Sequence, residues 1–157
     1  MSHASILVVD DERDIREQLG GILHDEGFAV TAVASGEEAL GRLAVDLYDL
    51  VLLDVMLPGM DGIEVLRQAR AAGHRTPVVV ISGHAGAELA VRAVREGAAD
   101  FMEKPLALER VLVTVRNTLA AARLEQRLTV ERGEEPLLTG VSPAIVELRR
   151  QILLAAP

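Results

Sequence analysis

The residues best placed to do chemistry are three aspartates that follow two apolar segments. Asp10 and Asp11 come directly after residues 5–9, and Asp54 comes directly after residues 50–53. If these segments are neighbouring parallel strands, their carboxyl ends meet at one edge of the sheet and the three carboxylates converge there. Carboxylates at close range repel one another unless a cation joins them. Oxygen ligands alone favour a hard ion, so the pattern predicts Mg²⁺ as a cofactor.

Each aspartate could instead serve only as the cap of the helix that follows it. Asp11 suits that role, because Glu12 and Asp14 place more negative charge in the first turn of the expected helix. Caps have no need to converge across strands, however. We therefore favour a shared metal site over three independent caps.

Two further polar residues fall at strand ends. Ser82 ends the apolar run 78–81, and Lys104 follows the run 100–102, directly before Pro105. Taken singly, Ser82 could cap the next helix and Lys104 could be an ordinary surface lysine. Together with the carboxylates, a hydroxyl and an ammonium supply the donors and positive charge that a transferred phosphoryl group requires.

The elements that must position these residues can be read from the periodicity. Apolar runs predict strands over residues 5–9, 28–33, 50–53, 78–81 and 100–102. The segments between them repeat apolar residues with helical period, and Gly27, Gly73 and Gly97 stand where those helices should end. Ser35 with Glu38 fits a capping box. This alternation predicts an α/β fold, a doubly wound five-stranded parallel sheet with helices on both faces.

The pattern changes toward the C-terminus. An apolar stripe from Leu106 to Leu128 is longer than the ~12 residues that cover a strand, so we expect an extended C-terminal helix. A solvated linker helix and a dimerising coiled coil explain its second half equally well. We expect one domain over 1–122, a helical linker over 123–136 and, over 137–157, the truncated start of a further domain whose helix opens at Ser142-Pro143.

Composition limits the function classes. The chain has 157 residues, of which 50% are hydrophobic and 25% charged, and a formal net charge of −8, which argues against binding a polyanion. The absence of Cys excludes disulfides and thiolate metal sites. Neither a signal peptide nor a run of ~18 apolar residues is present, so we expect a cytoplasmic protein without a membrane partner.

Four motifs in order resemble the receiver domain of bacterial two-component response regulators, over about residues 4–122. They are VVDDE (8–12), LLDVMLPGMDG (52–62), ISG (81–83) and EKP (103–105). The resemblance implies a flavodoxin-like (βα)5 fold with strand order 2-1-3-4-5. It also implies a signalling phosphoacceptor that takes a phosphoryl group from a sensor histidine kinase and catalyses its own phosphorylation and dephosphorylation, rather than an enzyme.

The resemblance also assigns roles to residues. Asp54 would accept the phosphoryl group, and Lys104 would pair with it. Ser82 would be the switch hydroxyl and Phe101 the switch aromatic that turns inward as Ser82 moves. The metal ligands would be Asp10, Asp11, Asp54 and the backbone carbonyl of Met56.

A second resemblance covers the tail. Residues 138–157 are similar to the opening of the AAA+ ATPase domain of NtrC-type activators of sigma-54 RNA polymerase. No P-loop sequence GxxxxGK[ST] occurs in these 157 residues. The resemblance implies that the receiver controls a downstream ATPase and transcription. It would do so by switching a homodimer through the fourth-helix, fifth-strand and fifth-helix face or through the last helix.

Two other functions remain open at this point. An Asp-nucleophile phosphatase of the haloacid-dehalogenase kind would need a second Asp two residues after the nucleophile, where this sequence has Met56. A receiver-like interaction module that is never phosphorylated usually lacks an acidic residue or the lysine, and both are present. Met56 and His84 should flank the phosphoryl group, and an apolar Met56 predicts its slow loss, unless Met56 serves only in packing.

Overall fold

The computed structural model describes residues 3–83 and 86–131, with side chains described as far as residue 128. In this part of the chain strands and helices alternate strictly: β1 (Ser5–Val9), α1 (Arg13–Asp25), β2 (Ala29–Val33), α2 (Gly36–Val45), β3 (Leu50–Asp54), α3 (Gly62–Ala71), β4 (Val78–Ser82), α4 (Ala87–Arg95), β5 (Asp100–Glu103) and α5 (Leu108–Glu131). All neighbouring strands are parallel, in the order β2-β1-β3-β4-β5. The predicted fold and strand order are confirmed.

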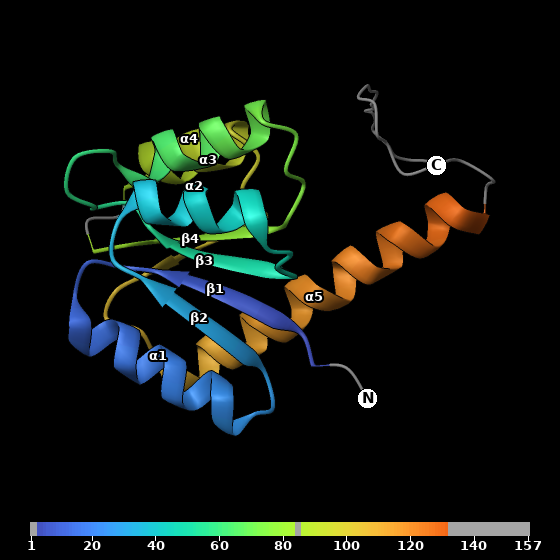
Figure 1. Ribbon diagram of the computed structural model, residues 1–157, viewed down its shortest axis with the longest axis horizontal. Helices are drawn as coiled ribbons and strands as arrows, with labels where there is room; N and C mark the ends of the chain where they lie inside the picture. The colour runs from blue at the N-terminus through green and yellow to red at the C-terminus, as the bar shows by residue number, and fades with distance from the viewer. Residues whose placement is uncertain (1–2, 84–85, 132–157) are drawn as a thin grey trace. The chain divides into compact units, whose positions relative to one another are not determined.

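Helices cover both faces of the sheet, with α1 and α5 on one face and α2, α3 and α4 on the other (Figure 1). The side chains of strand β1 alternate between the two faces of the sheet, so this strand packs against both layers of helices. Ile6 and Val8 pack with residues of α1 and α5, whereas Leu7 and Val9 pack with residues of α2 and α3. All four side chains are buried. A strand buried on both faces needs a continuous apolar run, which is what the sequence provides.

Local signals at the helix ends behave as expected, with two differences. Gly27, Gly73 and Gly97 follow α1, α3 and α4 with φ of 92°, 92° and 102°, a region that L-residues with a side chain rarely adopt. The Ser35 hydroxyl accepts a hydrogen bond from the Glu38 N–H, but the Glu38 carboxylate accepts from Ala34, one residue before the expected partner. Phe28 lies outside β2, because its N–H donates to Leu23 and closes the turn after α1.

The last helix has 24 residues, so the extended helix is confirmed. The chain divides into two compact units at Ala120, and α5 contributes to both. In the first unit, Val111, Val115 and Leu119 are buried under the sheet. In the second, Leu124 and Leu128 are exposed. The predicted linker end (132–136) and the predicted domain start (137–157), with Ser142-Pro143, lie outside the described residues, as does His84. Among the described residues, no helix has the length and apolarity that crossing a membrane requires.

Candidate functional site

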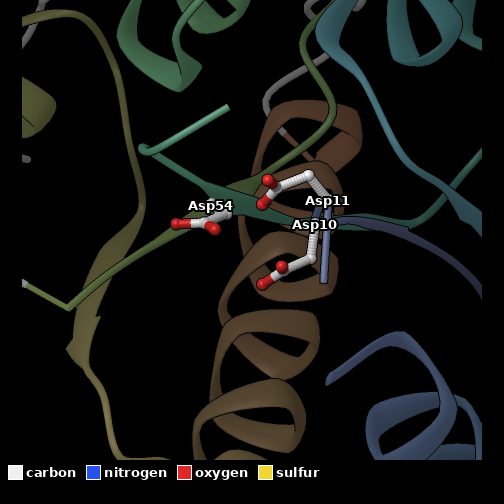
Figure 2. Close-up of side chains that lie close together, drawn as sticks. All are labelled: Asp10, Asp11 and Asp54. Carbon is white, nitrogen blue, oxygen red and sulfur yellow. The ribbon is translucent and has the colours of Figure 1, made fainter. Parts of the chain in front are cut away.

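Strand pairing brings the three aspartates together. Val9 of β1 lies beside Leu53 of β3, so Asp10 and Asp54, one residue further along each strand, reach the same carboxyl edge. One carboxylate oxygen from each of Asp10, Asp11 and Asp54 lies within 4.8 Å of the others. Figure 2 shows the three side chains leaving the ends of these strands close to one another. Asp10 and Asp54 are 1% exposed, whereas Asp11 faces solvent.

Lys104 joins the cluster from the loop after β5. Its ammonium lies 3.1 Å from Asp54 Oδ2 and 3.2 Å from Asp10 Oδ2, and its side chain is 17% exposed. The backbone N–H of Lys104 donates to the carbonyl of Ser82 at 2.8 Å, which fixes the loop after β5 against the end of β4. The peptide bond between Lys104 and Pro105 is cis. One ammonium therefore faces two buried carboxylates.

This imbalance of charge shows in the pKa values. Burial raises the pKa of Asp54 above its ordinary value of 3.8, and the negative charge of Asp10 adds to the rise. The Met56 N–H, which donates to Asp54 Oδ1 at 3.1 Å, and the Lys104 ammonium offset only part of it. Burial alone would lower the pKa of Lys104, but its hydrogen bond to Asp54 and the charge of Asp10 outweigh burial and raise it. The cluster still lacks positive charge.

One buried oxygen marks where that charge could be supplied. Within the described residues, Asp10 Oδ2 is buried and accepts no hydrogen bond. The Lys104 ammonium lies 3.2 Å away, so the two form an ion pair without the geometry of a hydrogen bond. A buried carboxylate oxygen in this state is unfavourable, and a divalent cation would use its lone pairs. With two more carboxylates beside it, this oxygen makes the site fit Mg²⁺.

The loop after Asp54 is held by an unusually close contact. The N–H of Gly62, the first residue of α3, donates to the Val55 carbonyl at 2.9 Å. A Cβ atom on Gly62 would lie 2.2 Å from the carbonyl oxygen of Asp54. Asp61 caps the same helix by accepting from the Glu64 N–H at 2.9 Å. Only a glycine lets α3 begin against the Asp54 backbone. Gly62 ends the motif over 52–62, but the sequence alone assigns it no role, because this close approach depends on tertiary packing.

The remaining predicted residues lie around the cluster. Ser82 is the last residue of β4 and is buried. Phe101 lies in β5 beside Val80 and is half-buried against the core under α2, α3 and α4. Met56 is 58% exposed, and its backbone N–H donates to Asp54 Oδ1.

The sequence is similar to those of known proteins. The response regulator receiver domain family matches residues 6–116. The C4-dicarboxylate transport transcriptional regulatory protein DctD of Rhizobium meliloti is 34% identical over 154 residues, which cover 94% of this chain and 34% of that protein. The nitrogen assimilation regulatory protein NtrX of Azorhizobium caulinodans is 37% identical over 161 residues, which cover 100% of this chain and 35% of that protein. The chain thus spans about a third of the length of both relatives.

A solved structure agrees in fold. NtrX from Brucella abortus superposes with a TM-score of 0.78 at 38% identity, covering 83% of this chain and 30% of that one. Receiver domains are signalling phosphoacceptors that bind Mg²⁺ at an acidic pocket, and histidine kinases phosphorylate response regulators. The match includes the ends of β1, β3, β4 and β5, where the acidic cluster, Ser82 and Lys104 lie. The chain therefore belongs to the response regulator receiver domain family.

Proposed function

We propose that Asp54 accepts a phosphoryl group from the phosphohistidine of a sensor histidine kinase. The observation that carries this proposal is the buried Asp54 carboxylate, which shares a single ammonium with Asp10 and lies beside the unbonded Asp10 Oδ2. A carboxylate oxygen of Asp54 attacks phosphorus, the N–P bond breaks, and the kinase histidine takes the leaving electron pair. The product is an acyl phosphate on Asp54.

The surrounding residues receive distinct roles in this proposal. Asp10, Asp11, Asp54 and the backbone carbonyl of Met56 hold Mg²⁺, which supplies positive charge to the transferring phosphoryl oxygens. Lys104, already 3.1 Å from Asp54, pairs with the same group once it is attached. Ser82 moves to donate its hydroxyl to the phosphoryl group, and Phe101 then turns inward, which biases the α4 and β5 surface between two states.

The test is intact-mass spectrometry after incubation with acetyl phosphate. We expect one added phosphoryl group that requires Mg²⁺ and is lost in Asp54→Asn. No adduct on a folded chain that binds Mg²⁺ would instead favour an interaction module that is never phosphorylated. A second substitution, Asp49→Asn, serves as the matched control, because Asp49 directly precedes β3, away from the acidic cluster, and accepts a hydrogen bond from the Ser5 N–H.

We further propose that phosphorylation switches dimerisation and, through it, a downstream output. Dimerisation through the α4-β5-α5 face is supported by exposed apolar residues on α4 and the first half of α5, namely Val91, Val94, Leu108 and Val113. Dimerisation through the last helix is supported by exposed Leu124 and Leu128 on the second half of α5. Sedimentation of both forms tests this idea, and an unchanged association state would contradict it.

The domain division proposed here is a receiver over 1–122, a helical linker over 123–136 and the start of an AAA+ domain over 137–157. The resemblance of the tail to NtrC-type sigma-54 activators supports it, as does similarity to DctD and NtrX, which are regulatory proteins about three times longer. We infer a cytoplasmic regulator of transcription. A longer chain that contains the ATPase domain should couple ATP hydrolysis to the state of Asp54, and hydrolysis independent of Asp54 would contradict that coupling.

A further inference from the structure

Arg16 of α1 contacts the acidic cluster at the backbone of Asp10 and not at a carboxylate. Its guanidinium Nη1 donates a hydrogen bond to the carbonyl oxygen of Asp10 at 2.9 Å. The side chain is half-buried. The position is one turn into α1, and the Arg16 N–H itself donates to the Glu12 carbonyl at 3.1 Å. Arg16 therefore closes the turn that connects β1 to α1.

Two further hydrogen bonds hold this turn. The Asp10 N–H donates to the Val33 carbonyl of β2 at 3.1 Å, and Asp10 Oδ1 accepts from the Glu12 N–H at 2.9 Å. The carbonyl that Arg16 bonds belongs to the peptide unit between Asp10 and Asp11. Because a peptide unit is planar, holding its oxygen also restrains the position of the Asp11 Cα atom, from which the Asp11 side chain leaves the backbone.

This matters most for Asp11. Its carboxylate is exposed, so it is placed by its backbone and not by surrounding packing. Yet one of its oxygens must stay within 4.8 Å of those of Asp10 and Asp54 for the three to share an ion. Groups that orient metal ligands in this way raise affinity, because the site needs no reordering when the ion binds.

We propose that Arg16 is a positioning residue that sets the affinity of the acidic cluster for a divalent cation. The inference rests on the proposed Mg²⁺ site. A guanidinium near a cation also repels it, so Arg16 has two opposing effects on affinity. If repulsion dominates, removal of Arg16 tightens Mg²⁺ binding; if positioning dominates, removal weakens it. The sign of the change separates the two.

The experiment measures the dissociation constant for Mg²⁺ in the unphosphorylated chain, from amide chemical shifts in an NMR titration. For Arg16→Ala we expect affinity to fall about tenfold. Arg13→Ala is the matched control, because Arg13 carries the same charge on the same helix, is 81% exposed and bonds only Glu17 among the described residues. We expect its affinity to stay within twofold of the original chain. Arg16→Lys should recover part of the loss, since it keeps a donor of similar reach.

The outcomes are distinguishable. Equal or tighter Mg²⁺ binding in Arg16→Ala overturns the positioning role and leaves the proposed function intact. If Arg16→Ala does not fold, Arg16→Lys decides the question. The lysine ammonium cannot reproduce the planar guanidinium, so we expect Mg²⁺ affinity in Arg16→Lys to be measurably lower than in the original chain. Unchanged Mg²⁺ affinity in Arg16→Lys would then overturn the positioning role. Failure of the original chain itself to bind Mg²⁺, or equal binding by Asp54→Asn, overturns the proposed Mg²⁺ site and with it this inference.

Discussion

The amino and carboxyl edges of the sheet hold charged side chains in opposite ways. At the amino edge, the Arg70 guanidinium donates to the carbonyls of His74, Thr76 and Gly97 at 3.0, 2.8 and 2.9 Å. It thereby connects the loop before β4 to the loop before β5. Burial and the charge of Arg75 lower its pKa, but its bonds are well formed. At the carboxyl edge, Asp10 and Asp54 share one ammonium, and one oxygen accepts no hydrogen bond among the described residues.

This difference distinguishes a charge that stabilises the fold from a charge cluster that is suited to binding a ligand. A charge whose hydrogen bonds are made within the chain stabilises the fold and needs no ligand. A charge cluster that the chain leaves short of positive charge is stabilised only when something binds. We therefore expect substitutions at the amino edge to change stability alone, and substitutions at the carboxyl edge to change both stability and chemistry.

Gly62→Ala should have the largest effect. The new Cβ would lie 2.2 Å from a backbone oxygen that cannot move aside easily, so α3 must shift away from Asp54. We expect the free energy of unfolding to fall by about 3 kcal/mol and phosphorylation by acetyl phosphate to slow. Gly41→Ala is the control: Gly41 lies within α2 and its Cβ would meet no atom within 4 Å, so stability should rise by about 0.5–1 kcal/mol. Chemical denaturation of both variants checks the pair, and equal behaviour would contradict the close contact.

Arg70→Ala tests the amino edge directly. This substitution removes the guanidinium that donates to the carbonyls of His74, Thr76 and Gly97. We therefore expect the free energy of unfolding to fall by about 2 kcal/mol. Mg²⁺ affinity and phosphorylation should stay within twofold. A large loss of either, with the fold intact, would show that the two edges are coupled and contradict their independence.

Asp54→Asn should stabilise the metal-free protein at neutral pH by about 1 kcal/mol, because it removes a repulsion between buried carboxylates. The sign of the pH dependence follows from the raised pKa of Asp54. Above the ordinary value of 3.8, the folded state binds the proton more tightly than the unfolded chain, so stability falls as pH rises through the raised pKa. Below 3.8 both states are protonated and the difference from Asn disappears. Thermal melts of both chains in the presence of a chelator, from below pH 3.8 to neutral pH, measure this difference in stability. A difference that grows toward acid pH would contradict the raised pKa of Asp54.

Met56→Asn should have the smallest effect. An amide two residues after Asp54 can orient water toward the phosphoryl group, which an apolar side chain cannot do. We expect loss of the phosphoryl group to accelerate about threefold. The decay of the phosphorylated mass with time gives the rate, and Met60→Asn, which alters a partly buried residue of the same loop packed on the core, is the comparison. Equal decay in the original chain and Met56→Asn would mean that Met56 serves only in packing.

Much of the fold and part of the site could be predicted from the sequence. Continuous apolar runs identified the strands, and the rule that ligands gather at carboxyl ends placed Asp10, Asp11 and Asp54 together. The contacts of Arg16, Gly62 and Arg70 could not be predicted in this way. Each depends on how far a side chain, or the lack of one, reaches across the turn between two elements. Such distances follow from tertiary packing and leave no periodic trace in the sequence.

The order of the strands determines which parts must join before the site is complete. Asp10 follows β1 and Asp54 ends β3, two strands that pair with each other, whereas Lys104 follows β5, an edge strand and the last of the five along the chain. Pairing of β1 with β3 alone therefore brings two carboxylates together without their ammonium. The charge balance of the site depends on the attachment of an edge strand to the sheet, so β5 contributes to function through the placement of Lys104 as well as through its pairing with β4.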